Sequence, residues 1–214
     1  MITALLFLAV VLLVGLLYFE KKAYHGGILP TKTVLSLLFI VAAVSQMHVL
    51  QPYSVWIIVG LLFCLGGDVF LALPQDRMFL FGLVSFLLGH VCYVAGFIWA
   101  ADLNFMTLIG LMLTLVIGIF IYNWLKPHLG NMKKPVIAYI LVISVMIIGA
   151  GSVLGSLQLP FWNRWFVFIG AASFYLSDIF VAKDRFLKSD FRNRLWGLPL
   201  YYLGQFLIAF SVGM

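Results

Sequence analysis

Residues 54–73 read SVWIIVGLLFCLGGDVFLAL and contain a single charged side chain, that of Asp68. A helix of about 20 mostly apolar residues is long enough to cross the hydrocarbon core of a bilayer. The rest of the chain has the same character: 64% of its 214 residues are hydrophobic, 9% are charged, and the mean hydropathy is +1.15. A soluble domain is nearer one half apolar and one quarter charged. The composition therefore predicts an integral membrane protein.

Seven further segments match this one in length and apolar character. We predict eight spanning helices, at residues 2–19, 31–48, 54–73, 78–100, 105–125, 134–155, 162–182 and 196–213. The connections are short and carry Pro, Gly or charged residues, which leaves no room for a soluble domain. The sequence thus predicts an all-α, polytopic membrane helix bundle that forms one transmembrane domain over residues 1–214. The first segment lacks a basic leader and a small-residue cleavage site, so we expect a retained span rather than a signal peptide.

Lysine and arginine are distributed unevenly over the loops. Twelve of the 13 lie in or beside the first, third, fifth and seventh loops, and Arg164 is the exception. Because cytoplasmic loops are enriched in these residues, the pattern predicts that the odd-numbered loops are cytoplasmic and that both termini lie outside. We expect this topology in the inner membrane of a bacterium. The basic residues form no patch interleaved with aromatic side chains, which argues against a nucleic-acid partner.

The sequence contains an internal repeat. Residues 67–72 (GDVFLA) match residues 177–182 (SDIFVA), and residues 81–90 (FGLVSFLLGH) match residues 196–205 (WGLPLYYLGQ) without a gap. The third and fourth spans thus resemble the seventh and eighth. An even number of spans separates the copies, so both point the same way through the membrane. We predict a parallel 4+4 duplication, of a kind seen in some transporters. Its halves cover roughly residues 1–103 and 104–214.

Asp68 and Asp178 occupy equivalent positions in this repeat, each near the predicted cytoplasmic end of an apolar span. An Asp at the centre of a spanning helix costs about 2.5–3.5 kcal/mol on insertion scales. Each carboxyl could simply hydrogen-bond a neighbouring helix end. Because the insertion cost is incurred twice, at equivalent positions of the repeat, we favour a functional pair over this alternative. We therefore predict that the two carboxyls face one shared cavity on the cytoplasmic side.

Other polar residues lie in the same or neighbouring spans. His90 is near the middle of the fourth span and shares a helical stripe with Tyr93, although such a stripe more often serves packing. A His in hydrocarbon needs a hydrogen-bond partner, and a carboxylate would serve. Lys32 could simply snorkel to the interface, and Ser177 could serve helix packing. With these alternatives open, the candidates for substrate binding are Lys32, Tyr93, Tyr139, Ser177, Tyr201 and Gln205.

Several enzyme classes lack their motifs in this sequence. It has no Gly-x-Ser-x-Gly nucleophile elbow, no His-Glu-x-x-His zinc motif and no Walker loop. The four histidines lie at scattered depths, which argues against a three-histidine zinc site. Cys64 and Cys92 fall within apolar segments and suggest neither a disulfide framework nor a metal pair. We therefore expect no metal and no cofactor.

Motifs along nearly the whole chain resemble those of the lysoplasmalogenase (YhhN-like) family of membrane proteins. They are GDVFL at 67–71, FxxGLxxFxxGHxxY at 79–93, GAxxFxxSD at 170–178 with Arg185 and Phe186, and YYLxQ at 201–205. One departure is Thr33, since the family tends to have Pro after the Lys at this point. The resemblance implies hydrolysis of the vinyl-ether bond of lysoplasmalogens. The products would be a fatty aldehyde and glycerophosphocholine or glycerophosphoethanolamine.

A vinyl ether is hydrolysed through protonation at carbon, which gives an oxocarbenium-like cation that water captures. This chemistry needs an acid, an anion and a base, as in glycosidases with two carboxyls. We predict that one of Asp68 and Asp178 is the acid and the other stabilises the cation, with His90 as proton partner. The lysophospholipid would enter from the membrane. Two alternatives stay open: a transporter that uses intramembrane carboxylates, and a structural or partner-binding membrane protein. The sequence does not indicate the oligomeric state.

Overall fold

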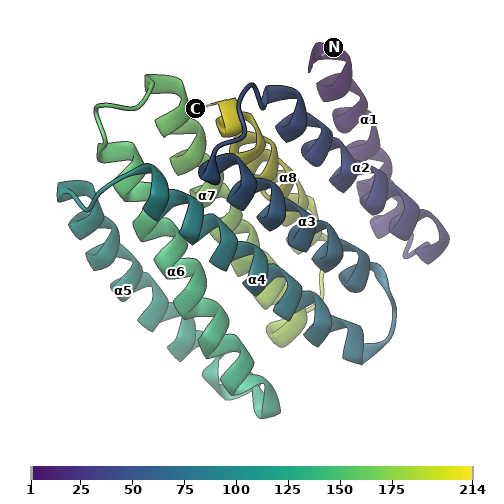
Figure 1. Cartoon of the computed structure of the whole chain (residues 1–214). Helices are drawn as coiled ribbons and strands as arrows, with labels where there is room; N and C mark the ends of the chain where they lie inside the picture. Colours follow the sequence, from purple (N-terminus) through teal and green to yellow (C-terminus); the bar gives the residue numbers. More distant parts are fainter. Residues whose placement is uncertain (1, 214) are drawn as a thin grey trace.

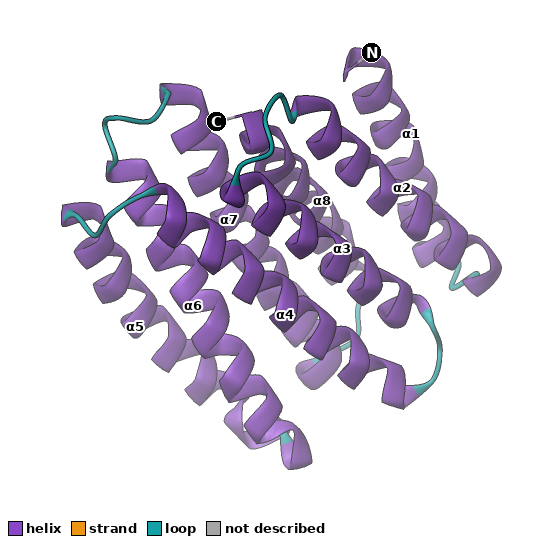
Figure 2. Cartoon of the chain, viewed as in Figure 1, coloured by secondary structure: helices purple, strands orange, loops and turns teal. Residues whose placement is uncertain are grey.

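The computed structural model describes residues 2–213, which form long helices joined by short connections and contain no strand (Figures 1 and 2). Eight helices within this range are long and apolar enough to cross a membrane, which confirms the predicted all-α membrane fold. They are α1 (Ile2–Lys21), α2 (His25–Gln46), α3 (Pro52–Ala72), α4 (Asp76–Ala100), α5 (Phe105–Leu125), α6 (Lys133–Gly155), α7 (Phe161–Ala182) and α8 (Phe191–Phe210). Short turns are η1 (Lys126–His128), η2 (Gly130–Met132), η3 (Lys183–Leu187) and η4 (Ser211–Gly213).

Two helices begin five or more residues earlier than the sequence predicts. Helix α2 continues through Pro30, where we expected it to begin at residue 31. Helix α8 begins at Phe191 rather than at residue 196, because the side chain of Asp190 accepts a hydrogen bond from the Arg192 N–H and caps the helix. The correction to α2 matters for the site, since it places Lys32 inside the helix instead of at its start.

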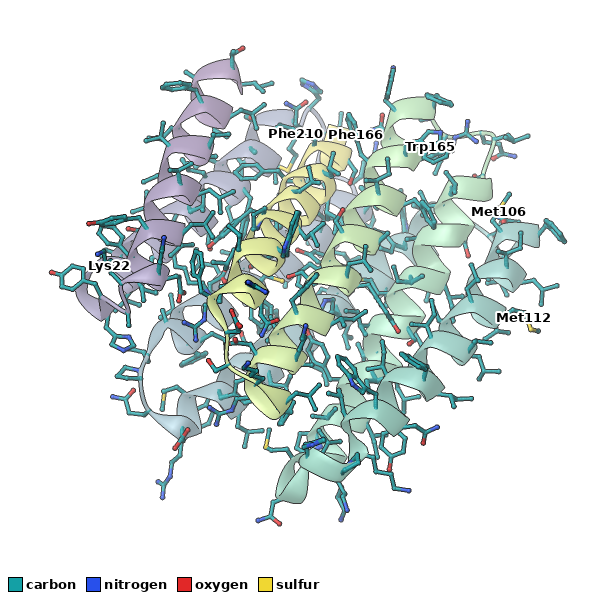
Figure 3. All side chains as sticks on the ribbon, turned by 180° about the vertical axis from the view of Figure 1, so that it is seen from behind. Lys22, Met106, Met112, Trp165, Phe166 and Phe210 are labelled. Atoms are coloured by element: carbon teal, nitrogen blue, oxygen red, sulfur yellow. The ribbon has the colours of Figure 1, made fainter. Side chains whose placement is uncertain are left out.

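The helices form a bundle in which α1 and α5 lie at opposite edges, and α7 and α8 cover one face between them (Figures 1 and 3). Helix α3 packs along α4, and α7 packs along α8. Helix α2 contacts α3 and α8, and α6 contacts the counterparts of these two helices, α7 and α4. Helices α2, α3 and α4 of the first half therefore correspond to α6, α7 and α8 of the second half, and corresponding helices have corresponding neighbours.

Glycines set the closest helix contacts in both halves. A Cβ atom on Gly60 would lie 3.0 Å from the Gly89 carbonyl oxygen, and one on Gly170 would lie 3.0 Å from the Gly204 carbonyl oxygen. Small residues let helix backbones approach this closely in membranes. The two pairs join α3 to α4 and α7 to α8 at equivalent points of the sequence repeat. This matched packing supports the 4+4 duplication, which stays a prediction.

Candidate functional site

A cavity of about 590 Å³ opens at the end of the bundle that carries the odd-numbered loops. Its wall includes residues of α1–α8 and of η3. Lys22 marks this end in Figure 3, opposite the end where Phe166 and Phe210 lie. Both intramembrane aspartates line the cavity, as do Lys32, Tyr139, Ser177 and Tyr201. Six of the nine candidate residues from the sequence therefore meet around one space.

Asp68 of α3 is buried and is held by three groups. Its Oδ2 accepts hydrogen bonds from the Ser36 hydroxyl at 2.6 Å and from the Tyr201 hydroxyl at 2.5 Å. Its Oδ1 lies 3.4 Å from the ammonium of Lys32, whose side chain is also almost fully buried. A buried carboxylate persists when it is paired and hydrogen-bonded in this way. This geometry suits an aspartate that remains anionic.

Asp178 of α7 has a simpler environment. Its Oδ2 accepts one hydrogen bond, at 2.7 Å, from the hydroxyl of Tyr139 on α6. Within residues 2–213, no Lys, Arg or His forms an ion pair with it. An unpaired charge in a mostly apolar setting is costly, so the neutral acid is the favoured form of such a side chain. The two carboxyls are thus equivalent in the sequence repeat and different in chemistry.

Helix phase explains the contacts of Asp68. Lys32 and Ser36 are one turn apart on α2, so both reach the same carboxyl of the adjacent helix. Tyr201 comes from α8, which packs against α2. Ser36 was missed by the sequence analysis. Its spacing from Lys32 was the signal that could have identified it, but only once Lys32 was known to lie inside a helix.

Two predicted substrate-binding residues lie behind the cavity wall. Gln205 donates from Nε2 to the Tyr201 hydroxyl at 3.3 Å and accepts at Oε1 from the Tyr93 hydroxyl at 2.7 Å. Both Tyr93 and Gln205 are fully buried and neither lines the cavity. They form a chain of hydrogen bonds that ends at Asp68 through Tyr201. Their contacts are those of positioning residues rather than of groups that touch a substrate.

His90 is also outside the cavity wall. Its side chain is fully buried, and neither ring nitrogen has a hydrogen-bond partner among the residues that the structure describes. The ring packs edge-on against Phe174, with 4.5 Å between ring centroids, and against Tyr139 at 5.3 Å. The expected carboxylate partner is not found. Of the aromatic rings packed against His90, those of Tyr93, Tyr139 and Phe174, the Tyr139 ring is the one that belongs to a residue of the cavity wall.

Metal binding has no evident site in the described part of the chain. Residues 2–213 contain no group of three His, Cys, Asp or Glu side chains placed to hold an ion. The absence of a metal and of a cofactor stays a prediction. The arrangement instead offers acid–base chemistry, because it combines one paired carboxylate, one unpaired carboxyl and tyrosine hydroxyls around a single cavity.

Several named proteins are similar in sequence to this chain over most of its length. It is 28% identical over 175 residues to the "Lysoplasmalogenase" of Mycobacterium bovis, a match that covers 78% of this chain and 62% of the relative. It is 30% identical over 179 residues to "Lysoplasmalogenase TMEM86A" of Bos taurus, which covers 81% and 72% of the two chains. It is 32% identical over 158 residues to "Lysoplasmalogenase TMEM86B" of Rattus norvegicus, which covers 73% and 61%. The chain thus spans about three fifths of the length of the mycobacterial relative.

No solved structure matches this chain significantly. The YhhN family profile matches residues 28–212, a region that runs from α2 to η4 and includes both aspartates. A match of this extent leaves only residues 1–27 and 213–214 outside the family domain. On this evidence the chain is a member of the YhhN family.

Proposed function

We propose that this protein hydrolyses the vinyl-ether bond of lysoplasmalogens within the membrane, releasing a fatty aldehyde and a glycerophospho-ethanolamine or -choline. The names of the relatives support this reaction class. The observation that carries the proposal is the unequal pair of aspartates on one cavity. Asp68 is paired with Lys32, whereas Asp178 within residues 2–213 has no ion pair and accepts one hydrogen bond, from the Tyr139 hydroxyl. Acid catalysis on a vinyl ether needs one neutral and one anionic carboxyl of this kind.

The walls of the cavity would orient such a lipid. The side formed by α5 and α6 is apolar, and it is lined by Ile121, Leu125, Val136, Ile140 and Ile143. The side formed by α1, α2 and α8 is polar. An alkenyl chain would therefore lie along α5 and α6, next to Asp178 and its α6 partner Tyr139. The headgroup and glycerol would lie on the side of Lys32 and Asp68.

The first chemical step assigns the acid. The carbon to be protonated is the second carbon of the alkenyl chain, which lies on the chain side of the ether oxygen. Asp178, on the apolar side, donates its proton to that carbon, and the π electrons form the new C–H bond. The positive charge spreads over the first carbon and the ether oxygen. Asp68, kept anionic by Lys32, stabilises this charge electrostatically.

Water then completes the hydrolysis. A water molecule oriented by Asp68 adds to the first carbon, and the Asp178 carboxylate accepts its proton. The resulting hemiacetal collapses when Asp178 protonates the glycerol oxygen and receives the proton of the hemiacetal hydroxyl. The bond between the first carbon and the glycerol oxygen breaks in this step. The products are the aldehyde and the glycerophosphodiester, and Asp178 returns to its acid form.

The test uses purified protein in detergent with lysoplasmenylethanolamine as substrate. Aldehyde release should be abolished by Asp178→Asn and strongly reduced by Asp68→Asn. Asp102→Asn is the matched control, because Asp102 is exposed at the opposite end of the bundle. Lysolipids with an ester or an alkyl ether in place of the vinyl ether should not react. Full activity of either site variant would rule out the two-carboxyl mechanism. Uptake of unaltered lipid into proteoliposomes, without aldehyde release, would favour a transporter.

A further inference from the structure

The mouth of the cavity carries an ion cluster that the hydrolysis mechanism does not use. Arg194 of α8 places one guanidinium nitrogen 3.4 Å from Glu20 of α1 and another 3.1 Å from Asp184 of η3. All three side chains line the cavity. Two carboxylates thus share one guanidinium, so the cluster has an excess of negative charge.

The two carboxylates differ in how fully they are bonded. Asp184 also accepts hydrogen bonds from the Asp190 N–H and the Asn193 amide, so it serves the turn between α7 and α8. The Glu20 side chain is only 12% exposed, and its long contact with Arg194 is its one ion pair with another described residue. Within residues 2–213 that carboxylate accepts no hydrogen bond, and the Arg194 side chain donates its hydrogen bonds to Asp184 and Ser189. A mostly buried carboxylate with one long contact has acceptor capacity left for a cation.

Arg194 has donor capacity left as well. Its side chain is 36% exposed although it contacts two carboxylates and the Ser189 hydroxyl, and a guanidinium carries five N–H donors. The cavity mouth therefore presents an available carboxylate directly beside a guanidinium that can still donate. A phosphate linked by a short chain to an ammonium group has the complementary pair of charges. A headgroup with phosphate alone would meet the two carboxylates around Arg194 and be repelled.

We propose that Glu20 and Arg194 bind the zwitterionic headgroup of the lysolipid, with the ammonium on Glu20 and the phosphate on Arg194. This inference rests on the proposed function and adds a selectivity to it. Glu20 and Arg194 also lie on the polar side of the cavity, which is the side proposed to hold the glycerol end of the substrate. Glu20 precedes residue 28, where the family match begins, so this selectivity would reside in the first helix of this chain.

The experiment compares two vinyl-ether lipids with the same alkenyl chain, lysoplasmenylethanolamine and 1-alkenylglycerol 3-phosphate. In Glu20→Gln, kcat/KM for the zwitterionic lipid should fall about tenfold, mainly through KM, since a hydrogen bond between charged groups is lost. Activity on the anionic lipid should stay level or rise, which also shows that the variant is folded. Glu20→Asp keeps the charge and should retain most of the preference. Asp102→Asn, which removes an exposed carboxylate at the opposite end of the bundle, is the control and should leave the preference unchanged.

Equal losses on both lipids, or an unchanged preference, would overturn the headgroup site while leaving the hydrolase proposal intact. A second measurement tests the headgroup site even if the proposed hydrolysis is wrong. Alkyl-ether lysolipids with the same two headgroups lack the double bond and cannot react, so their binding can be measured directly. The parent protein should bind the zwitterionic analogue more tightly than the anionic one, and Glu20→Gln should bind the two equally. This result would support the headgroup site even if neither vinyl ether is hydrolysed. Equal binding of the two analogues by the parent protein would contradict it.

Discussion

Lys32 of α2 lies 3.4 Å from Asp68 of α3, and both side chains are almost completely buried. Removal of one partner of such a pair leaves an uncompensated charge, which typically costs about 3 kcal/mol or more. We therefore expect Lys32→Met to lower the free energy of unfolding by about 3 kcal/mol and to reduce aldehyde release strongly. Thermal unfolding in detergent and the aldehyde assay measure the two effects.

The double variant Lys32→Met with Asp68→Asn removes both charges together and is the control for this prediction. It should recover much of the lost stability and none of the activity, because the anion near the reacting carbon is gone. A single Lys32→Met variant as stable as the parent would show that the pair carries little energy. In that case the reason for an anionic Asp68 would be lost.

The two site tyrosines should contribute unequally. Among the described residues Tyr139 is the one hydrogen-bond donor to Asp178, whereas Tyr201 shares Asp68 with Ser36 and Lys32. Tyr139→Phe should therefore reduce kcat about tenfold, and Tyr201→Phe should reduce it about threefold or less. Tyr202→Phe is the control, because the Tyr202 hydroxyl has no hydrogen-bond partner among the described residues and Tyr202 does not line the cavity. A larger loss from Tyr201→Phe than from Tyr139→Phe would reverse our assignment of the acid.

The glycine contacts predict a matched effect in both halves of the bundle. An alanine at residue 60 would meet the Tyr93 ring and the Gly89 carbonyl, and one at residue 170 would meet Ile208 and the Gly204 carbonyl. Gly60→Ala and Gly170→Ala should each destabilise the protein by about 1–3 kcal/mol, since backbone atoms cannot move away easily. Gly15→Ala is the control, because nothing lies within 4 Å of the added atom. Similar unfolding temperatures for all three variants would contradict this account of the packing.

The eight spans and the positions of Asp68 and Asp178 within them were predictable because they depend on where apolar residues lie along the chain. A spanning helix needs only length and hydropathy. The equivalence of the two aspartates came from the sequence repeat. Lys32, Tyr139, Ser177 and Tyr201 were predicted as site residues, and all four line the cavity. Their roles in binding remain predictions.

The remaining features depend on how each helix is rotated and where it begins. Tyr93 and Gln205 were expected at the substrate, but they form a hydrogen-bonded layer behind Tyr201. Glu20 and Arg194 are 174 positions apart in the sequence and meet because α1 packs on α8. No periodicity within either helix indicates that contact. Helix rotation in the membrane is set by packing with neighbours, which a single sequence does not reveal.

His90 gives the clearest conflict between the sequence-based role and the geometry. Its ring nitrogens have no partner within residues 2–213, and aromatic rings surround it. A buried imidazole without hydrogen bonds contributes no polar stabilisation and incurs a desolvation cost. We therefore expect His90→Leu, which keeps an apolar side chain of similar size, to leave aldehyde release within about twofold of the parent and stability unchanged or higher. His90→Ala is the comparison that tests packing, because it leaves a cavity beside Phe174 and Tyr139 and should be destabilising. Complete loss of activity in a folded His90→Leu variant would restore His90 as the proton partner of the aspartates.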